Sequence, residues 1–137
     1  MIVGLLIALA FLLMRLTVSG TATDQRRLTV TRLEAVADAL TKYALDNNGY
    51  FPTAKQGLAA LLECPTTPPV PRNWRGPYLD DPKVIKDAWG RAFLYTTPGL
   101  GDPPQPYDLK SLGADGAEGG EGPDADLSYW DRTTLLP

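Results

Sequence analysis

The apolar positions of this chain follow two patterns, and the change between them falls near residue 24. Residues 2–14 form an unbroken apolar run, which Arg15 interrupts before Leu16–Val18 resume it. A membrane-spanning helix needs ~20 apolar residues, so the run is short, although the Arg15 guanidinium can reach a headgroup region and lengthen it. A secretory signal peptide would carry a basic segment before the run, and a buried core helix would need a larger head around it. The pattern favours an apolar N-terminal helix over residues 1–23 that serves as a membrane anchor.

From Asp24 onward, apolar residues recur at the spacing of one helix face. This stripe consists of Leu33, Val36, Ala37, Leu40, Tyr43 and Ala44. Asn47-Asn48-Gly49 tolerate a left-handed backbone and are expected to end the helix. Apart from Ser19-Gly20, no strong breaker separates the stripe from the apolar run. The sequence therefore predicts one helix of roughly forty residues, ~60 Å long, that is apolar all round in its first half and one-sided in its second.

The rest of the chain is expected to complete a head over residues 24–137. Thr53–Gln56 has the composition of a capping box before a short helix that Pro65 ends. Pro65–Pro77 is a proline-rich connector, and Trp74 gives it a large anchor on the head.

Three short segments of the head have the composition of strands. They are residues 92–97, 107–111 and 127–130, separated by turn-forming residues. Together with the amphipathic helix they predict an α+β fold, in which the long N-terminal helix packs on a small antiparallel sheet.

Acidic residues gather near the C-terminus. The chain carries 16 acids and 13 bases, but Gly113–Asp131 holds six acids and no base, which leaves 10 acids and 13 bases elsewhere. The six are Asp115, Glu118, Glu121, Asp124, Asp126 and Asp131. Six uncompensated carboxylates repel one another unless a cation neutralises them. A solvated acidic loop is the alternative interpretation.

The same segment is rich in glycine, with Gly113, Gly116, Gly119, Gly120 and Gly122. Calcium takes six to eight oxygens from short carboxylates and carbonyls on a chain that can fold tightly, whereas magnesium demands stricter octahedral geometry. The spacing does not match an EF-hand. On residues alone, a calcium loop and a flexible solvated loop remain equal alternatives.

Composition argues against several other functions. The chain has no histidine, which removes Ser-His and Cys-His nucleophile pairs and the usual zinc ligands. Its bases are scattered, so a nucleic-acid partner is not expected. Cys64 is the only cysteine and cannot form an internal disulfide. Asp124 and Asp126 also permit a glycosidase interpretation, but two residues so close in one loop define no sugar cleft. We therefore expect no enzyme.

Several motifs, taken in order, resemble one family. Asn48-Gly49-Tyr50-Phe51-Pro52-Thr53 precedes Gln56-Gly57-Leu58, and Pro68-Pro69-Val70-Pro71-Arg72-Asn73-Trp74 precedes Gly76-Pro77-Tyr78. Asp87-Ala88-Trp89-Gly90 is followed by Phe93 and Tyr95. With residues 111–130, these motifs resemble the major pseudopilin, or G subunit, of type II secretion systems over residues 33–131. Ala88 and Ala92 stand where that family usually has proline, which loosens the turn.

The resemblance implies a type IV pilin-like fold and a structural role. It implies a single pass through the inner membrane of a Gram-negative bacterium, with the head in the periplasm. It also implies a homopolymeric filament that works with minor pseudopilins and the inner-membrane secretion platform. The alternatives are another type IV pilin-like subunit, or a membrane-tethered calcium-binding module that does not polymerise.

The resemblance also implies a calcium ion in the C-terminal loop. Carried over to this sequence, Asp115, Asp124 and Asp126 would supply side-chain oxygens, and Leu112 and Ala117 backbone carbonyls. The family's precursor begins with a basic leader, a cleavage-site glycine and Phe-Thr-Leu-x-Glu. Residues 1–6 resemble the family's apolar segment directly after that glutamate, so we expect the reading frame to begin upstream of Met1.

Overall fold

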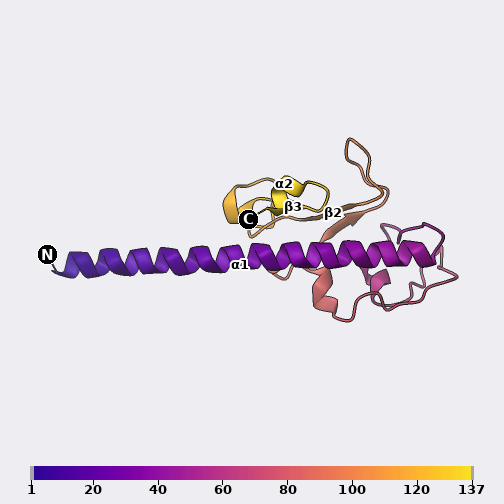
Figure 1. Ribbon diagram of the computed structural model, residues 1–137, viewed down its shortest axis with the longest axis horizontal. Helices are drawn as coiled ribbons and strands as arrows, with labels where there is room; N and C mark the ends of the chain where they lie inside the picture. Colours follow the sequence, from indigo (N-terminus) through magenta and orange to yellow (C-terminus); the bar gives the residue numbers. More distant parts are fainter. Residues whose placement is uncertain (1, 137) are drawn as a thin grey trace.

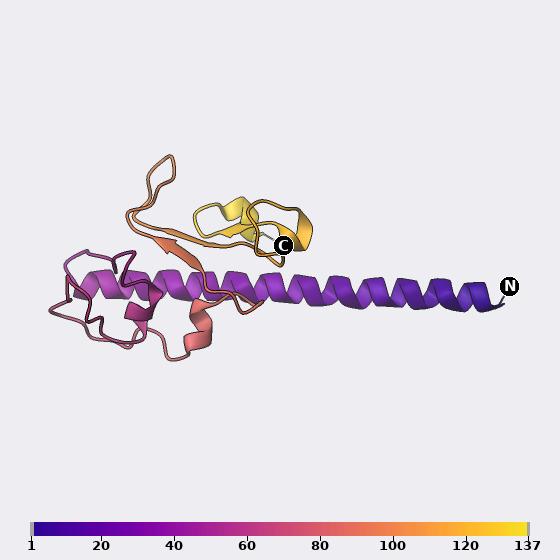
Figure 2. The ribbon, with the colours of Figure 1, turned by 180° about the vertical axis from the view of Figure 1, so that it is seen from behind.

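One long helix organises the molecule. The computed structural model describes residues 2–136, and for residues 2, 3 and 15–20 it describes the backbone alone. Helix α1 (Ile2–Asp46) has 45 residues, and the head packs around its C-terminal half (Figure 1). Seen from behind, its N-terminal half projects away from the head (Figure 2). The predicted continuous helix is confirmed, whereas the predicted role of the Arg15 side chain lies outside the described side chains.

The two halves of α1 differ in their surroundings. Residues 4–14 are exposed all round, while Leu33, Val36 and Leu40 in the second half have no exposed surface. In the part of the chain that the structure describes, no helix combines the length and the hydropathy of a membrane span. The division of the chain at residues 23 and 24 stays a prediction.

The C-terminal end of α1 follows the predicted signal. Asn48 and Gly49 have positive φ angles of 58° and 84°, and the N–H of Gly49 donates to the carbonyl of Ala44 at 2.8 Å. These left-handed residues satisfy a carbonyl of the last turn and redirect the chain.

The segment after α1 confirms the predicted capping box and the short helix after it, which is of the 3-10 type. The backbone N–H of Thr53 donates to Gln56 Oε1 at 2.9 Å, and that of Gln56 donates to Thr53 Oγ1 at 3.1 Å. The helix that comes next is a short 3-10 helix, η1 (Leu58–Leu61). Trp74 donates its indole N–H to the carbonyl of Ala60 at 2.9 Å, so the proline-rich connector is anchored on the head as predicted.

The sheet has three antiparallel strands in the order β1-β2-β3. They are β1 (Leu94–Thr96), β2 (Asp108–Ser111) and β3 (Leu127–Ser128), with Tyr95 opposite Leu109 and Ser111 opposite Leu127. Each is shorter than predicted. Proline at position 98 lacks an N–H for the ladder, and after β3 the chain turns into the short helix α2 (Arg132–Leu135), which Asp131 caps.

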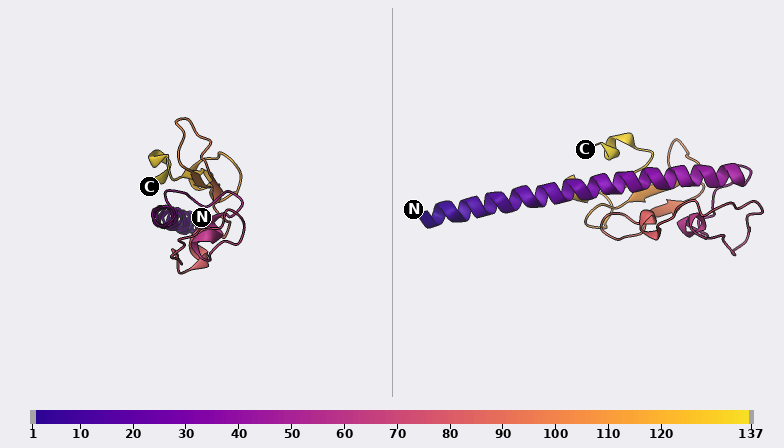
Figure 3. Two further views of the ribbon diagram at one scale, coloured as in Figure 1. Left: turned by 90° about the vertical axis from the view of Figure 1, so that its right-hand side faces the viewer. Right: turned by 60° about the horizontal axis from the view of Figure 1, so that its bottom comes forward.

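The core lies where α1, η1 and the sheet meet. It consists of Leu33, Val36, Ala37, Ala39, Leu40, Tyr43, Leu58, Ala60, Leu61, Phe93, Tyr107, Leu109 and Leu127. The view along the helix shows head elements on more than one side of α1 (Figure 3). Two further 3-10 helices, η2 (Pro82–Ile85) and η3 (Gly122–Asp124), belong to the connections. The acidic segment leaves this core at β2 and returns to it at β3.

Candidate calcium loop

The connection between β2 and β3, residues 112–126, is a loop that folds back on itself; we call it the acidic loop. We call the part of the loop that follows β2 the outgoing limb and the part that leads to β3 the returning limb. The N–H of Ala114 on the outgoing limb donates to the carbonyl of Pro123 on the returning limb at 3.0 Å and joins the two. Gly113 has φ +70°, and a Cβ there would lie 2.5 Å from the carbonyl oxygen of Asp124. Only glycine suits a left-handed residue with a backbone so close to it.

The predicted ligands are distributed over both limbs. Leu112 is half-buried directly after β2, and Asp115 and Ala117 are exposed on the outgoing limb. Asp124 and Asp126 are half-buried on the returning limb. Asp115 Oδ1 accepts a hydrogen bond from the backbone N–H of Ala117 at 3.0 Å, which links two of the five.

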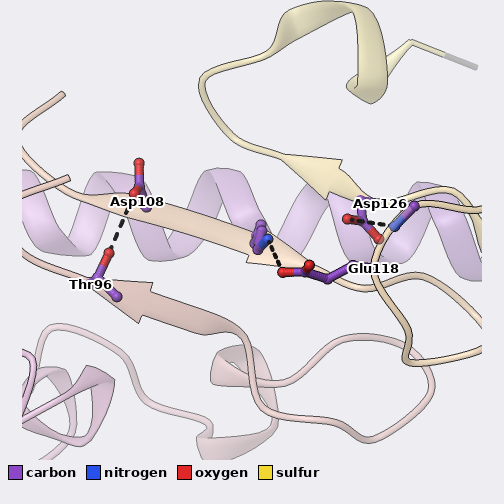
Figure 4. A network of polar contacts seen from close by, with 6 residues as sticks. Thr96, Asp108, Glu118 and Asp126 are labelled. Atoms are coloured by element: carbon purple, nitrogen blue, oxygen red, sulfur yellow. Dashed lines mark hydrogen bonds and ion pairs between the residues drawn. The ribbon is translucent and has the colours of Figure 1, made fainter. Parts of the chain in front are cut away.

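Two further polar contacts involve the acids of the loop (Figure 4). The backbone N–H of Gly119 donates to Asp126 Oδ2 at 3.2 Å, and Lys110 Nζ lies 3.4 Å from Glu118 Oε1. Within residues 2–136, no three acidic side chains gather closely enough to hold a metal ion. The set of five calcium ligands therefore stays a prediction.

One oxygen in the loop fits a cation. Asp126 Oδ1 is buried and has no hydrogen-bond partner among the described residues. A buried carboxylate oxygen without a partner is costly, and a cation would satisfy it. The predicted donors are all carboxylate or carbonyl oxygens, the chemistry that calcium prefers. In the type of their donor atoms, the predicted ligands thus suit calcium.

Two residues outside the loop, Asp87 and Arg91, hold the outgoing limb. The sequence analysis did not connect either of them with the loop. Arg91 Nη2 donates to the carbonyls of Gly113 and Ala114, both at 2.6 Å. Asp87 is 2% exposed; its Oδ2 accepts from Ser111 Oγ at 2.8 Å. The motif around Asp87 is one of those that resemble the family. Ser111, the partner of Asp87 at the end of β2, lies 24 residues further along the chain, so no local sequence pattern predicts the contact.

The returning limb is held by an arginine of α1. Arg26 Nη1 donates to the carbonyl of Ala125 at 2.8 Å, and its Nη2 donates to the carbonyl of Thr134 at 3.3 Å. Burial lowers the pKa of this guanidinium below its ordinary value. Arg26 lies 99 residues before Ala125, so no pattern in the sequence points to the pair.

The Asp87 turn accommodates the departure from the family's proline. The backbone N–H of Ala88 donates to Thr29 Oγ1 at 3.1 Å, and Thr29 is completely buried in α1. Proline at position 88 would have no N–H for this bond. Alanine therefore ties the turn to the long helix.

Comparison with known proteins gives consistent matches. A family model described as type II secretion system (T2SS), protein G, matches residues 17–130. Type II secretion system core protein G of Pseudomonas aeruginosa is 46% identical over 112 residues, which are 80% of this chain and 75% of that protein. The protein of the same name from Vibrio cholerae is 45% identical over 108 residues, 78% of this chain and 68% of that protein.

A solved structure agrees with the sequence matches. The crystal structure of the major pseudopilin from the type 2 secretion system of enterohaemorrhagic Escherichia coli superposes with a TM-score of 0.65 at 33% identity, covering 81% of this chain and 90% of that one.

A long N-terminal helix packed on a small antiparallel sheet, superposing on a pseudopilin, defines the α+β fold of the type IV pilin-like class. Within that class, the chain belongs to the type II secretion system protein G family. It is a structural pseudopilin of the cell envelope, a component of the pseudopilus rather than an enzyme.

Proposed function

We propose that this chain is the filament-forming major pseudopilin of its secretion system. Before assembly it is inserted once in the inner membrane of a Gram-negative bacterium, with its head in the periplasm. In the filament its partners are further copies of itself, together with minor pseudopilins and the inner-membrane secretion platform.

The observation that carries this proposal is the exposure of the projecting half of α1. Leu5 is 75% exposed, Phe11 63% and Met14 66%, in the part of α1 that the head does not cover. An apolar surface of this kind marks a membrane or protein contact. Lipid would cover it in the membrane, and the helices of neighbouring copies would cover it in the filament. Gly4 and Ala8 are small residues that let such helices approach closely.

Crosslinking in cells tests the filament. We would place a single cysteine at Leu9 in a Cys64→Ser background, in cells that express the secretion system, and treat them with a membrane-permeant bismaleimide. The proposal predicts that the chain is found in the membrane fraction and that crosslinking gives a ladder of multimers. The matched control is a cysteine at Leu100, which lies on the turn between β1 and β2 and is 83% exposed; it should give a much weaker ladder. Monomer alone at both positions would contradict polymerisation and would support the tethered module instead.

We further infer that the head binds one calcium ion through Asp115, Asp124 and Asp126 and through the carbonyls of Leu112 and Ala117. The buried, unpartnered Asp126 Oδ1 and the six acids of the segment support this inference. Bound calcium would neutralise the acids and link the two limbs of the loop. Calorimetry of the full chain in detergent should show one calcium site and much weaker binding of magnesium. No heat with calcium would contradict the site.

A further inference from the structure

We propose that Arg91 is a positioning residue of the acidic loop: it holds the outgoing limb folded without metal and thereby sets the affinity for calcium. The inference rests on the proposed calcium function and concerns a residue outside the predicted ligand set.

Arg91 contacts three residues of the outgoing limb from outside the loop. Its Nη2 donates to the carbonyls of Gly113 and Ala114 at 2.6 Å each. A Cβ at Gly116 would lie 2.8 Å from Arg91 Nε and 2.9 Å from Cζ, so the guanidinium lies against the Gly116 backbone. Hydrogen bonds from a charged donor are roughly twice as strong as neutral ones. One side chain thus fixes the path of the limb.

The backbone of Arg91 is itself held by Asp87. The N–H of Asp87 donates to the carbonyl of Arg91 at 2.8 Å, and the N–H of Arg91 donates to Asp87 Oδ1 at 2.9 Å. The other oxygen of Asp87 accepts from Ser111 Oγ, which in turn accepts from the N–H of Gly113 at 3.2 Å. The Asp87–Arg91 turn therefore holds Gly113 at both its N–H and its carbonyl.

The fixed residues lie between two proposed ligands. Gly113 and Ala114 separate the carbonyl of Leu112 from the carboxylate of Asp115. Ordering a glycine-rich limb costs conformational entropy. If Arg91 orders the limb before calcium arrives, binding does not bear that cost and the affinity rises.

The positive charge of Arg91 opposes calcium, but weakly. Arg91 is exposed, so water and salt screen its repulsion. The carbonyls that Arg91 binds are those of Gly113 and Ala114, which are not among the proposed calcium ligands. Pre-ordering of the limb should therefore outweigh the repulsion.

The experiment uses the full chain in detergent and three variants. Arg91→Gln removes the positive charge and most of the hydrogen-bond donors of the guanidinium. Arg91→Lys keeps the charge but loses the planar arrangement of those donors. Arg72→Gln is the control, because it removes a guanidinium from the exposed proline-rich connector. Calcium affinity is measured by calorimetry. Cleavage after Glu118 and Glu121 by a glutamate-specific protease is measured in chelator.

We expect Arg91→Gln to weaken calcium binding by about tenfold, as loss of a residue that orients metal ligands does, and to speed cleavage in chelator. Arg91→Lys should fall between, and Arg72→Gln should match the unaltered chain. Unchanged or tighter calcium binding in a folded Arg91→Gln protein would overturn the proposal; if that variant does not fold, Arg91→Lys decides by the same criteria. If the unaltered chain binds no calcium, the proposed site fails and the affinity claim fails with it, while the cleavage rates still decide whether Arg91 holds the limb.

Discussion

The core of the head and the acidic loop beside it are held by different forces. Leu33, Leu40 and Leu109 have no exposed surface, whereas residues 117–123 are all exposed. The core is stabilised by burial of apolar surface, which depends little on ions. The loop is held by backbone hydrogen bonds, by two arginines and, as we propose, by calcium. The stability of the core should therefore be independent of cations, and that of the loop should depend on them.

The largest effect should come from the core. Leu109→Ala in β2 removes a fully buried side chain and leaves a cavity, so the free energy of unfolding should fall by about 2–5 kcal/mol. Denaturant unfolding with calcium and with chelator measures it, and the loss should be the same in both. Leu100→Ala, at an exposed turn, should change stability by less than about 0.5 kcal/mol. A loss at Leu109 that depends on calcium would break the contrast between core and loop.

A smaller effect should come from the close approach within the loop. Gly113→Ala introduces a Cβ at a left-handed residue and 2.5 Å from the Asp124 carbonyl, so unfolding free energy should fall by about 2–3 kcal/mol. Gly119 has φ +85° but open space around its Cβ position. Gly119→Ala should therefore cost only about 1 kcal/mol for the backbone strain. Equal losses in the two variants would show that the limbs do not meet as described.

The smallest effect should be a loss of core stability at alkaline pH. Burial raises the pKa of the Tyr95 and Tyr107 hydroxyls above their ordinary value of 10.0. The folded protein keeps both protonated while the unfolded chain ionises, so stability is complete below pH 10 and falls as pH rises above it. Residues 112–126 contain no tyrosine, so the calcium-dependent part should not share this fall.

Denaturant unfolding on either side of pH 10 checks the alkaline prediction. Tyr95→Phe should reduce the fall with pH, because it removes one of the two ionising groups. A pH dependence equal to that of the unaltered chain would contradict the role of Tyr95.

The fold was predictable where the sequence carries local periodicity. The stripe from Leu33 to Ala44 predicted the packed face of α1, and Asn48 and Gly49 predicted its end. The presence of three strands was also predictable, but not their ends, because β3 stops where Asp131 begins to cap α2. The position and composition of the loop were predictable, while the identity of its ligands came from the family resemblance. Arg26 and Arg91 were not predictable, because the contacts that they make join distant parts of the chain.

Thermal unfolding of the full chain in detergent tests the central claim most directly, that calcium holds the loop of this pseudopilin. Calcium at a hundredfold excess over its dissociation constant should raise the free energy of unfolding by ~2.7 kcal/mol. Chelator should therefore lower the Tm and calcium should restore it. Asp115→Ala should lose most of that recovery, whereas Asp102→Ala, in the exposed turn between β1 and β2, should keep it. A Tm that is the same with calcium and with chelator in the unaltered chain would contradict the account.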